Sequence, residues 1–268
     1  MKRVIAGALG AVFLGLGTQT AVAAEAGAPL PDYDWSFEGI FGHFDRAAAQ
    51  RGLQVYQEVC AGCHSLRFVA FRDLADLGYN AEQIKAFAAE ATVEDGPDEE
   101  GEMFERAGLP ADRFPSPFPN DKAAAAANGG AAPPDLSLMA KARVGGASYI
   151  RALLVGYRDS PSAEFLQHYA EAHEGEEFEL LDGQNFNLYF PGNKIAMAAP
   201  LFEDGVEYQD GTAATVDQMA ADVSHFLMWT AEPKMEERKR MGLKVILFLL
   251  VFTGILYAVK RKVWADLH

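Results

Sequence analysis

The chain contains 268 residues, with 23 lysines and arginines against 38 aspartates and glutamates, and its formal net charge is −15. A charge this negative argues against a nucleic-acid partner and favours a basic one. The sequence holds two cysteines, and because no further Cys or His ligands follow at a comparable spacing, it also argues against a zinc site.

An export signal is the first predicted element. Lys2 and Arg3 precede an apolar run from Val4 to Leu16, and Ala21-Val22-Ala23-Ala24 has the form of a cleavage site. We predict a signal peptide over residues 1–24. The alternative, an uncleaved membrane anchor, is less favoured because the run is short for a span and ends in a processing-like site. About 244 residues remain, enough for one core with appendages.

The motif with the clearest chemistry is Cys60-Ala61-Gly62-Cys63-His64. C-x-x-C-H is the attachment sequence of c-type haem, in which two thiols on one turn bond the two vinyl groups and the histidine binds the iron from one face. A redox dithiol and a chance match are the alternatives. The export signal favours haem, because bacterial c-type cytochromes receive their haem outside the cytoplasm.

The elements predicted on either side of this motif are helical. Asp45 is a candidate N-cap for a helix that runs to Val59 and delivers Cys60. Helical spacing of Phe and Leu side chains continues from Ser65 to about Ala91. An acidic run follows, and the prolines between residues 110 and 119 exclude regular helix there.

Further helices are predicted up to residue 233. Three are short: 122–128, which ends at two glycines, 136–143 with Asp135 as its cap, and 149–157. Residues 158–195 read as irregular. The last helix starts from Thr215, shows apolar residues at i, i+3, i+4 and i+7, and closes at Pro233.

A membrane anchor is predicted at the C-terminus. A charged neck over 234–242 leads into the apolar stretch 243–259, and a basic tail over 260–268 follows. The stretch is apolar all round and flanked by charge, which favours a transmembrane helix over a buried core helix. With an exported N-terminus, a single span leaves the haem domain, residues 25–233, outside and the tail in the cytoplasm.

A haem bound by one histidine leaves its sixth position to a second ligand. Met197 lies in an apolar, non-periodic loop between Pro191 and Pro200, where a thioether can be held against iron away from water. We predict Met197 as this ligand, and His/Met ligation gives a high reduction potential. The other candidates are His43, His168, His173, His225, His268, Met139, Met219 and Met228. We expect His168 and His173 to be solvated, His225 to lie at the surface or to pack, and Met219 and Met228 to pack in the core.

The acidic side chains gather in two runs, one from Glu94 to Glu105 and one from Glu171 to Glu179. A solvated surface that keeps the protein soluble accounts for both runs. A docking surface for a basic redox partner accounts for them equally well.

Four segments together resemble the cytochrome c1 family, the haem subunit of the quinol:cytochrome c oxidoreductase. They are the C-x-x-C-H motif, Pro133-Pro134-Asp135-Leu136-Ser137, the methionine loop from Tyr189 to Pro200, and the neck from Phe226 to Lys244. The resemblance covers nearly the whole mature chain. It implies a mainly α fold, with a class I cytochrome c-like haem domain, irregular insertions and one C-terminal transmembrane helix.

The resemblance also implies a binding site for one covalent haem c. Its residues would be Cys60 and Cys63 as the attachment thiols, His64 and Met197 as the axial ligands, Arg143 at a propionate, and Tyr149 and Asn128 as further contacts. The region 158–185 departs from the family forms and holds no cysteine, so no disulfide can brace it.

One-electron transfer is the function that the resemblance implies. A Rieske iron–sulfur subunit would reduce the haem and a soluble cytochrome c would take the electron, in a dimeric, membrane-embedded complex with cytochrome b. The chain would not be catalytic alone, and its haem domain would face the periplasm from the bacterial inner membrane. The alternatives are a free-standing tethered carrier or dehydrogenase haem subunit, and a haem sensor or peroxidase with an open sixth site.

Overall fold

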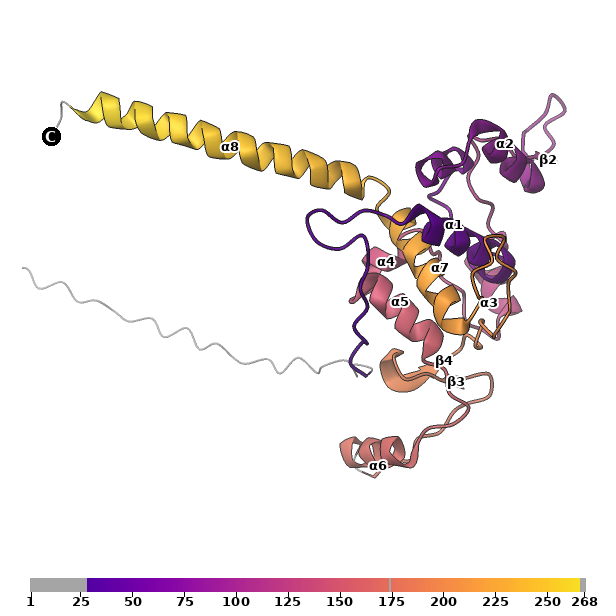
Figure 1. Ribbon diagram of the computed structural model, residues 1–268. Helices are drawn as coiled ribbons and strands as arrows, with labels where there is room; N and C mark the ends of the chain where they lie inside the picture. Colours follow the sequence, from indigo (N-terminus) through magenta and orange to yellow (C-terminus); the bar gives the residue numbers. More distant parts are fainter. Residues whose placement is uncertain (1–27, 174, 266–268) are drawn as a thin grey trace, which may run out of the picture.

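The computed structural model describes residues 28–173 and 175–265, and the predicted signal peptide lies outside them. The fold is mainly helical, as predicted. Its centre is helix α7 (Val216–Ala231), which has α1 (Arg46–Val55) and α5 (Gly146–Val155) packed along it (Figure 1). The C-x-x-C-H motif follows α1 in the chain, and the segment that leads to Met197 is hydrogen-bonded to α5 through Asn187 and Leu153.

Helix α7 is buried on several faces because helices cover it from different sides. Thr215 caps it by accepting a hydrogen bond from the Gln218 amide, so the helix starts where the sequence predicts. Met219 is completely buried, which confirms its predicted role in core packing. The close approach of α1 requires Gly52, because a Cβ built there would lie 2.0 Å from the carbonyl oxygen of Asp222.

Helix α1 leads directly to the cysteine motif. Its N-cap is Asp45, whose carboxylate accepts hydrogen bonds from the amides of Ala47 and Ala48. After Val55 the backbone widens into one π-helical turn, η1 (Tyr56–Cys60), and the Ala61 amide donates to the Tyr56 carbonyl over 2.8 Å. The helix therefore delivers Cys60 as predicted, with a wider last turn.

The segment from 65 to 91 contains less helix than its spacing predicts. It forms a 3-10 helix, η2 (Phe71–Leu77), and α2 (Ala81–Glu90), separated by Gly78 with φ of 97°. The acidic run then forms a hairpin of β1 (Thr92–Asp95) and β2 (Phe104–Ala107), in antiparallel register with Thr92 opposite Ala107. The hairpin was not anticipated, since its strands alternate too briefly to stand out.

Two of the three short helices lie close to their predicted positions. Helix α3 (Asp121–Ala127) and α5 match within three residues, but α4 (Met139–Ala142) is shorter than predicted because Asp135 bonds to another segment. The prediction of an irregular 158–195 was wrong in part. This region contains α6 (Ala163–Ala172), capped by Ser162, the short strands β3 (Asn185–Phe186) and β4 (Lys194–Ile195), and the 3-10 turn η3 (Pro191–Asn193).

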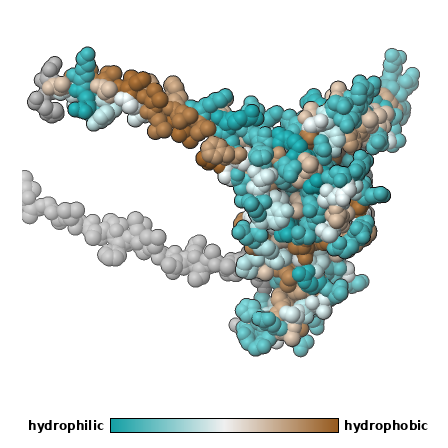
Figure 2. All heavy atoms as spheres, in the orientation of Figure 1, coloured by the Kyte–Doolittle hydropathy of each residue, from teal (hydrophilic) through white to brown (hydrophobic). Residues whose placement is uncertain are grey.

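Helix α8 (Met235–Trp264) leaves the haem domain as a single continuous helix. Its apolar side chains from Met241 onward are exposed, and Figure 2 shows them as a hydrophobic band beyond a largely hydrophilic head. Among the described residues this is the one helix long and apolar enough to cross a membrane. The alternative of a buried core helix is wrong, and the helix fits a single-pass anchor whose helical structure begins already in the neck.

Candidate haem site

The C-x-x-C-H motif forms a tight turn at the end of η1. The amides of Cys63 and His64 both donate to the Cys60 carbonyl, over 3.1 and 2.9 Å. A Cβ built on Gly62 would meet no heavy atom within 4 Å, so the turn has open space on this side. Cys60 is half-buried against the core and Cys63 is exposed.

The two thiols are not joined in a disulfide. Burial, together with the neighbouring Cys63, raises the pKa of the Cys60 thiol to about 12. A redox dithiol of the C-x-x-C type works with a lowered thiol pKa, because the thiolate is its nucleophile. The environment of Cys60 therefore argues against the redox-dithiol alternative.

The imidazole of His64 has a defined orientation. Its Nδ1 lies 2.8 Å from the carbonyl oxygen of Pro134, which accepts a hydrogen bond from the ring when Nδ1 carries the proton. Burial lowers the pKa of His64, so the neutral ring is favoured. A neutral ring with its Nδ1–H bound to a carbonyl has its Nε2 lone pair available for a metal, which is the usual arrangement of a histidine ligand.

The segment 133–137 is fastened to the chain just after His64, and we call it the proline strap. Asp135 accepts hydrogen bonds from the Ser65 hydroxyl over 2.8 Å and the Arg67 amide over 2.9 Å. The Leu136 amide donates to the Ser65 carbonyl, and the fully buried Ser137 accepts from the Phe68 amide. The carbonyl that orients His64 thus sits on a rigidly tied segment.

Met197 lies in a loop held by Tyr157, which follows α5, and by Asn185 of β3. The Tyr157 hydroxyl donates to the Met197 carbonyl over 3.0 Å, and the Asn185 side-chain amide lies 3.4 Å from the same oxygen. Burial raises the pKa of Tyr157, which keeps the phenol protonated and able to donate. These bonds fix the backbone of the loop at Met197.

Asn187 is a second support of this loop that the sequence analysis missed. It is fully buried, its side-chain Oδ1 accepts hydrogen bonds from the backbone amides of Tyr189 and Phe190, and its side-chain NH2 group donates to the Leu153 carbonyl on α5. An asparagine in a segment read as irregular gives no signal of such burial. Its partners tie the start of the methionine loop to α5.

The remaining predicted residues divide between two places. Arg143 is exposed between α4 and α5, and its charge acts on the phenol of Tyr149, which in turn lies near Tyr157. These residues therefore form one neighbourhood with the methionine loop. Asn128 lies at the end of α3, where its side-chain amide donates to the Ala124 carbonyl.

Together these residues supply two unpaired thiols, one oriented neutral imidazole and one thioether in a tied loop, which is a donor set that fits a covalently attached haem. The sequence itself matches the model of the Cytochrome C1 family over residues 35–267. The chain belongs to the cytochrome c1 family. Its members carry electrons through a haem, so a covalently bound haem c is the cofactor of this chain.

Individual relatives agree with this assignment. Cytochrome c1 of Rhodospirillum rubrum is 52% identical over 248 residues, which is 92% of this chain and 91% of the relative. Cytochrome c1 of Saccharomyces cerevisiae, a mitochondrial heme protein, is 47% identical over 94% of this chain and 77% of its own length. The cytochrome b/c1 protein of Bradyrhizobium diazoefficiens is 51% identical over 97% of this chain, which spans 39% of that longer protein.

Proposed function

We propose that Cys60 and Cys63 hold the haem by thioether bonds and that His64 and Met197 are its axial ligands. The observation that carries this assignment is the 2.8 Å contact between His64 Nδ1 and the Pro134 carbonyl, which leaves Nε2 for iron. Arg143 is assigned to a propionate by charge, with Tyr149 beside it. Asn128, at the end of α3, is assigned as a further haem contact from the family resemblance.

The bound haem supplies reversible one-electron chemistry at its iron. The residues of this chain perform no bond-making step. The proline strap and the bonds to the Met197 carbonyl hold the two ligands in place, so little reorganisation accompanies a change of charge. The thioether ligand and burial raise the reduction potential relative to two histidines.

We infer that this chain works in a quinol:cytochrome c oxidoreductase, where a Rieske iron–sulfur subunit delivers the electron and a soluble cytochrome c removes it. The Bradyrhizobium relative supports a cytochrome b partner, because its name, cytochrome b/c1, joins cytochrome b and cytochrome c1 in a single protein. The complex is assigned as a dimer from the family resemblance. The exposed acidic runs support a basic electron acceptor.

The proposed location is the bacterial inner membrane, with the haem domain in the periplasm. In this arrangement residues 1–24 are removed, 25–233 form the haem domain, 234–242 the neck, 243–259 the span and 260–268 the cytoplasmic tail. The exposed apolar surface of α8 supports the span. Helix α8 runs unbroken through the neck, so the haem domain leads directly into the proposed membrane span.

The complex can be tested by a mild-detergent purification through a tag placed after His268, with a reduced-minus-oxidised spectrum and a quinol-dependent cytochrome c reduction assay. We expect a b-type haem band to co-elute with the c band and turnover to stop with quinol-site inhibitors. A lone c band without turnover would mean a free-standing tethered carrier.

The ligand assignment can be tested with Met197→Leu. We expect the reduced variant to bind carbon monoxide and its reduction potential to fall, because a strong sixth ligand is lost. Met139→Leu, which changes a methionine on α4 outside the loop, is the matched control and should leave both properties unchanged. Carbon monoxide binding by the unchanged chain would instead favour the sensor or peroxidase alternative.

A further inference from the structure

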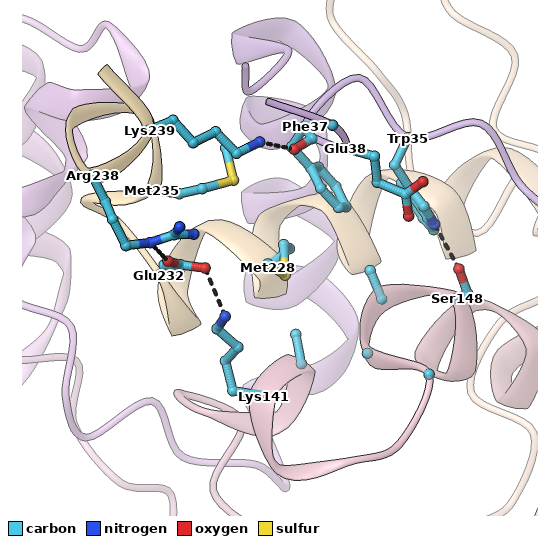
Figure 3. A pocket seen from close by; sticks show the side chains of 15 residues that line it. Trp35, Phe37, Glu38, Lys141, Ser148, Met228, Glu232, Met235, Arg238 and Lys239 are labelled. Atoms are coloured by element: carbon cyan, nitrogen blue, oxygen red, sulfur yellow. Dashed lines mark hydrogen bonds and ion pairs between the residues drawn. The ribbon is translucent and has the colours of Figure 1, made fainter. Parts of the chain in front are cut away.

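A pocket of about 370 Å³ opens where α8 leaves the haem domain (Figure 3). Four parts of the chain line it: the N-terminal segment, the turn between α4 and α5, the end of α7 and the start of α8. None of its lining residues is a proposed haem ligand or thiol. Its volume lies in the range of pockets that bind small molecules.

Three basic side chains line this pocket. Lys141 comes from α4, and Arg238 and Lys239 come from the first turns of α8. Lys141 Nζ lies 2.7 Å from Glu232, and Arg238 also pairs with Glu232, so one carboxylate is shared by two cations. Lys239 donates to the Phe37 carbonyl over 2.5 Å, a neutral partner. In the lining of the pocket these three bases face two acids, Glu232 and Glu38, so one positive charge is in excess.

The N-terminus of α5 adds to this positive field. Residues 145–148 line the pocket, and no side chain caps this ten-residue helix. The first amides of a helix carry a positive partial charge that favours an anion. Besides Glu232, a second acid opposes it: Glu38 is exposed on the side of the pocket across from Arg238 and Lys141 (Figure 3).

The pocket combines this charge with an apolar wall at the level of the membrane surface. Trp35, Phe37, Met228 and Met235 supply the apolar side chains. The exposed apolar run of α8 begins at Met241, two residues beyond Lys239, which is about 3 Å along a helix. If α8 spans the membrane, the basic groups lie where lipid headgroups lie.

We propose that this pocket binds the headgroup of an anionic glycerophospholipid of the phosphatidylglycerol type. The phosphodiester meets Lys141, Arg238 and Lys239, and the glycerol backbone lies against the apolar wall while the acyl chains follow α8. The proposal rests on the membrane anchoring in the proposed function. The lipid would hold the α4–α5 turn to the base of the anchor.

The test uses the full-length, haem-loaded chain in nanodiscs of phosphatidylcholine with graded phosphatidylglycerol, and counts the lipids retained after detergent extraction by native mass spectrometry. We expect the wild type to retain one phosphatidylglycerol in preference to phosphatidylcholine. Lys141→Gln and Arg238→Gln should each lower its affinity roughly fivefold, the effect of one basic charge near an anionic lipid. Glu38→Gln should raise it.

The matched control is Lys234→Gln, which removes the same charge from the same neck but does not line the pocket, since Lys234 pairs with Asp76. An equal loss of phosphatidylglycerol affinity in this control would mean that the lipid is attracted to the basic surface in general, and it would overturn the proposed pocket site. Displacement by inorganic phosphate at equal concentration would assign the site to a free anion. If, in the mild-detergent purification of the complex, Lys141→Gln loses co-purifying cytochrome b while lipid retention is unchanged, the pocket would be assigned to a protein segment, and either result overturns the proposal.

Failure of the anchor itself is recognised separately. Extraction of the wild-type chain from membranes by alkaline carbonate would show that α8 does not span, which contradicts the proposed function before any lipid is counted. A chain that resists carbonate, keeps its haem spectrum and retains no phosphatidylglycerol would overturn the lipid site alone.

Discussion

His225 is a buried histidine with a structural task. It is 4% exposed, its Nε2 accepts a hydrogen bond from the Asp45 amide over 3.0 Å, and the edges of Phe37 and Phe44 surround the ring. Burial lowers the pKa of His225 from 6.5 to about 4. The histidine joins the N-cap of α1 to α7 in its neutral form, which agrees with the prediction that it packs rather than binds iron.

This shift predicts how stability depends on pH. The unfolded chain takes up the His225 proton near pH 6.5 and the folded chain only near 4, so stability is complete above 6.5 and falls as the pH drops toward 4. We expect a loss of about 3 kcal/mol over this window. Urea unfolding of His225→Gln should show a flatter profile there, whereas His168→Gln, exposed on α6, should keep the wild-type slope.

Asp135 holds the proline strap against the segment that follows the haem motif. Burial opposes its ionisation, but hydrogen bonds from the Arg67 amide, Ser65 and Ser137 outweigh it and lower the pKa of Asp135. We expect Asp135→Asn to lower the free energy of unfolding by about 1–3 kcal/mol, because a well-bonded carboxylate is lost. Asp159→Asn, at an exposed position, is the control in urea unfolding. Equal stability of the two variants would contradict this role.

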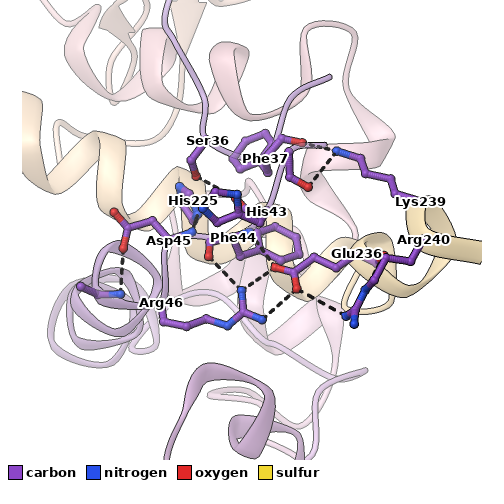
Figure 4. Close-up of polar contacts among 12 residues, drawn as sticks. Ser36, Phe37, His43, Phe44, Asp45, Arg46, His225, Glu236, Lys239 and Arg240 are labelled. Atoms are coloured by element: carbon purple, nitrogen blue, oxygen red, sulfur yellow. Dashed lines mark hydrogen bonds and ion pairs between the residues drawn. The ribbon is translucent and has the colours of Figure 1, made fainter. Parts of the chain in front are cut away.

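At the scale of elements, the junction between α8 and the haem domain is held by polar contacts from the loop before α1 (Figure 4). Glu236 accepts two hydrogen bonds from the Arg46 guanidinium, at 2.5 and 3.1 Å, and one from the Phe44 amide at 2.8 Å. The Arg46 side chain lowers the pKa of Glu236 to about 2. The neck is therefore part of the domain and not a flexible tether.

Replacing Glu236 with glutamine tests this junction. We expect the free energy of unfolding of the haem domain to fall by about 1–2 kcal/mol at pH 7, since the ion pair is only partly shielded from water. Because the folded pKa of Glu236 is depressed, its contribution should vanish as the pH falls from 4.5 toward 2. Glu237→Gln changes the next, exposed carboxylate, and an equal effect there would show that only net charge matters.

At the scale of the whole molecule, the net charge of −15 produces a long-range field that would attract a basic redox partner of the proposed kind. Part of the first acidic run lies in the exposed tip of the β1–β2 hairpin, away from the α7 core (Figure 1). Long-range attraction to a basic protein is screened within about 8 Å at physiological salt. The surface thus favours capture at low ionic strength.

Stopped-flow measurement of electron transfer can test this field. We expect the bimolecular rate with a basic cytochrome c to fall about tenfold between low and physiological salt. Ferricyanide, a small anion, is the control acceptor, and its rate should rise with salt because repulsion is screened. Identical salt dependence for both acceptors would leave the acidic runs with solubility as their only role.

The sequence by itself determined the haem motif, the Thr215-capped central helix and the apolar anchor. Each depends on residue types at a local spacing: two thiols and a histidine on one turn, an apolar face of period 3.6, and an uninterrupted apolar stretch. The predictions of Asp45 as a cap and of Gly129 and Gly130 as a helix end succeeded for the same reason, since caps are short-range.

The tertiary structure alone decided the contacts that hold the site. The Asp135–Ser65 and Tyr157–Met197 bonds join residues 70 and 40 positions apart, and His225 reaches Asp45 across 180. Such pairs follow from how α1 and α5 pack on α7, which no local spacing encodes. Asp135 shows the consequence: the sequence reads it as a cap, but the packed chain uses its carboxylate to fasten the segment after His64, because a buried carboxylate is stable only where several donors converge.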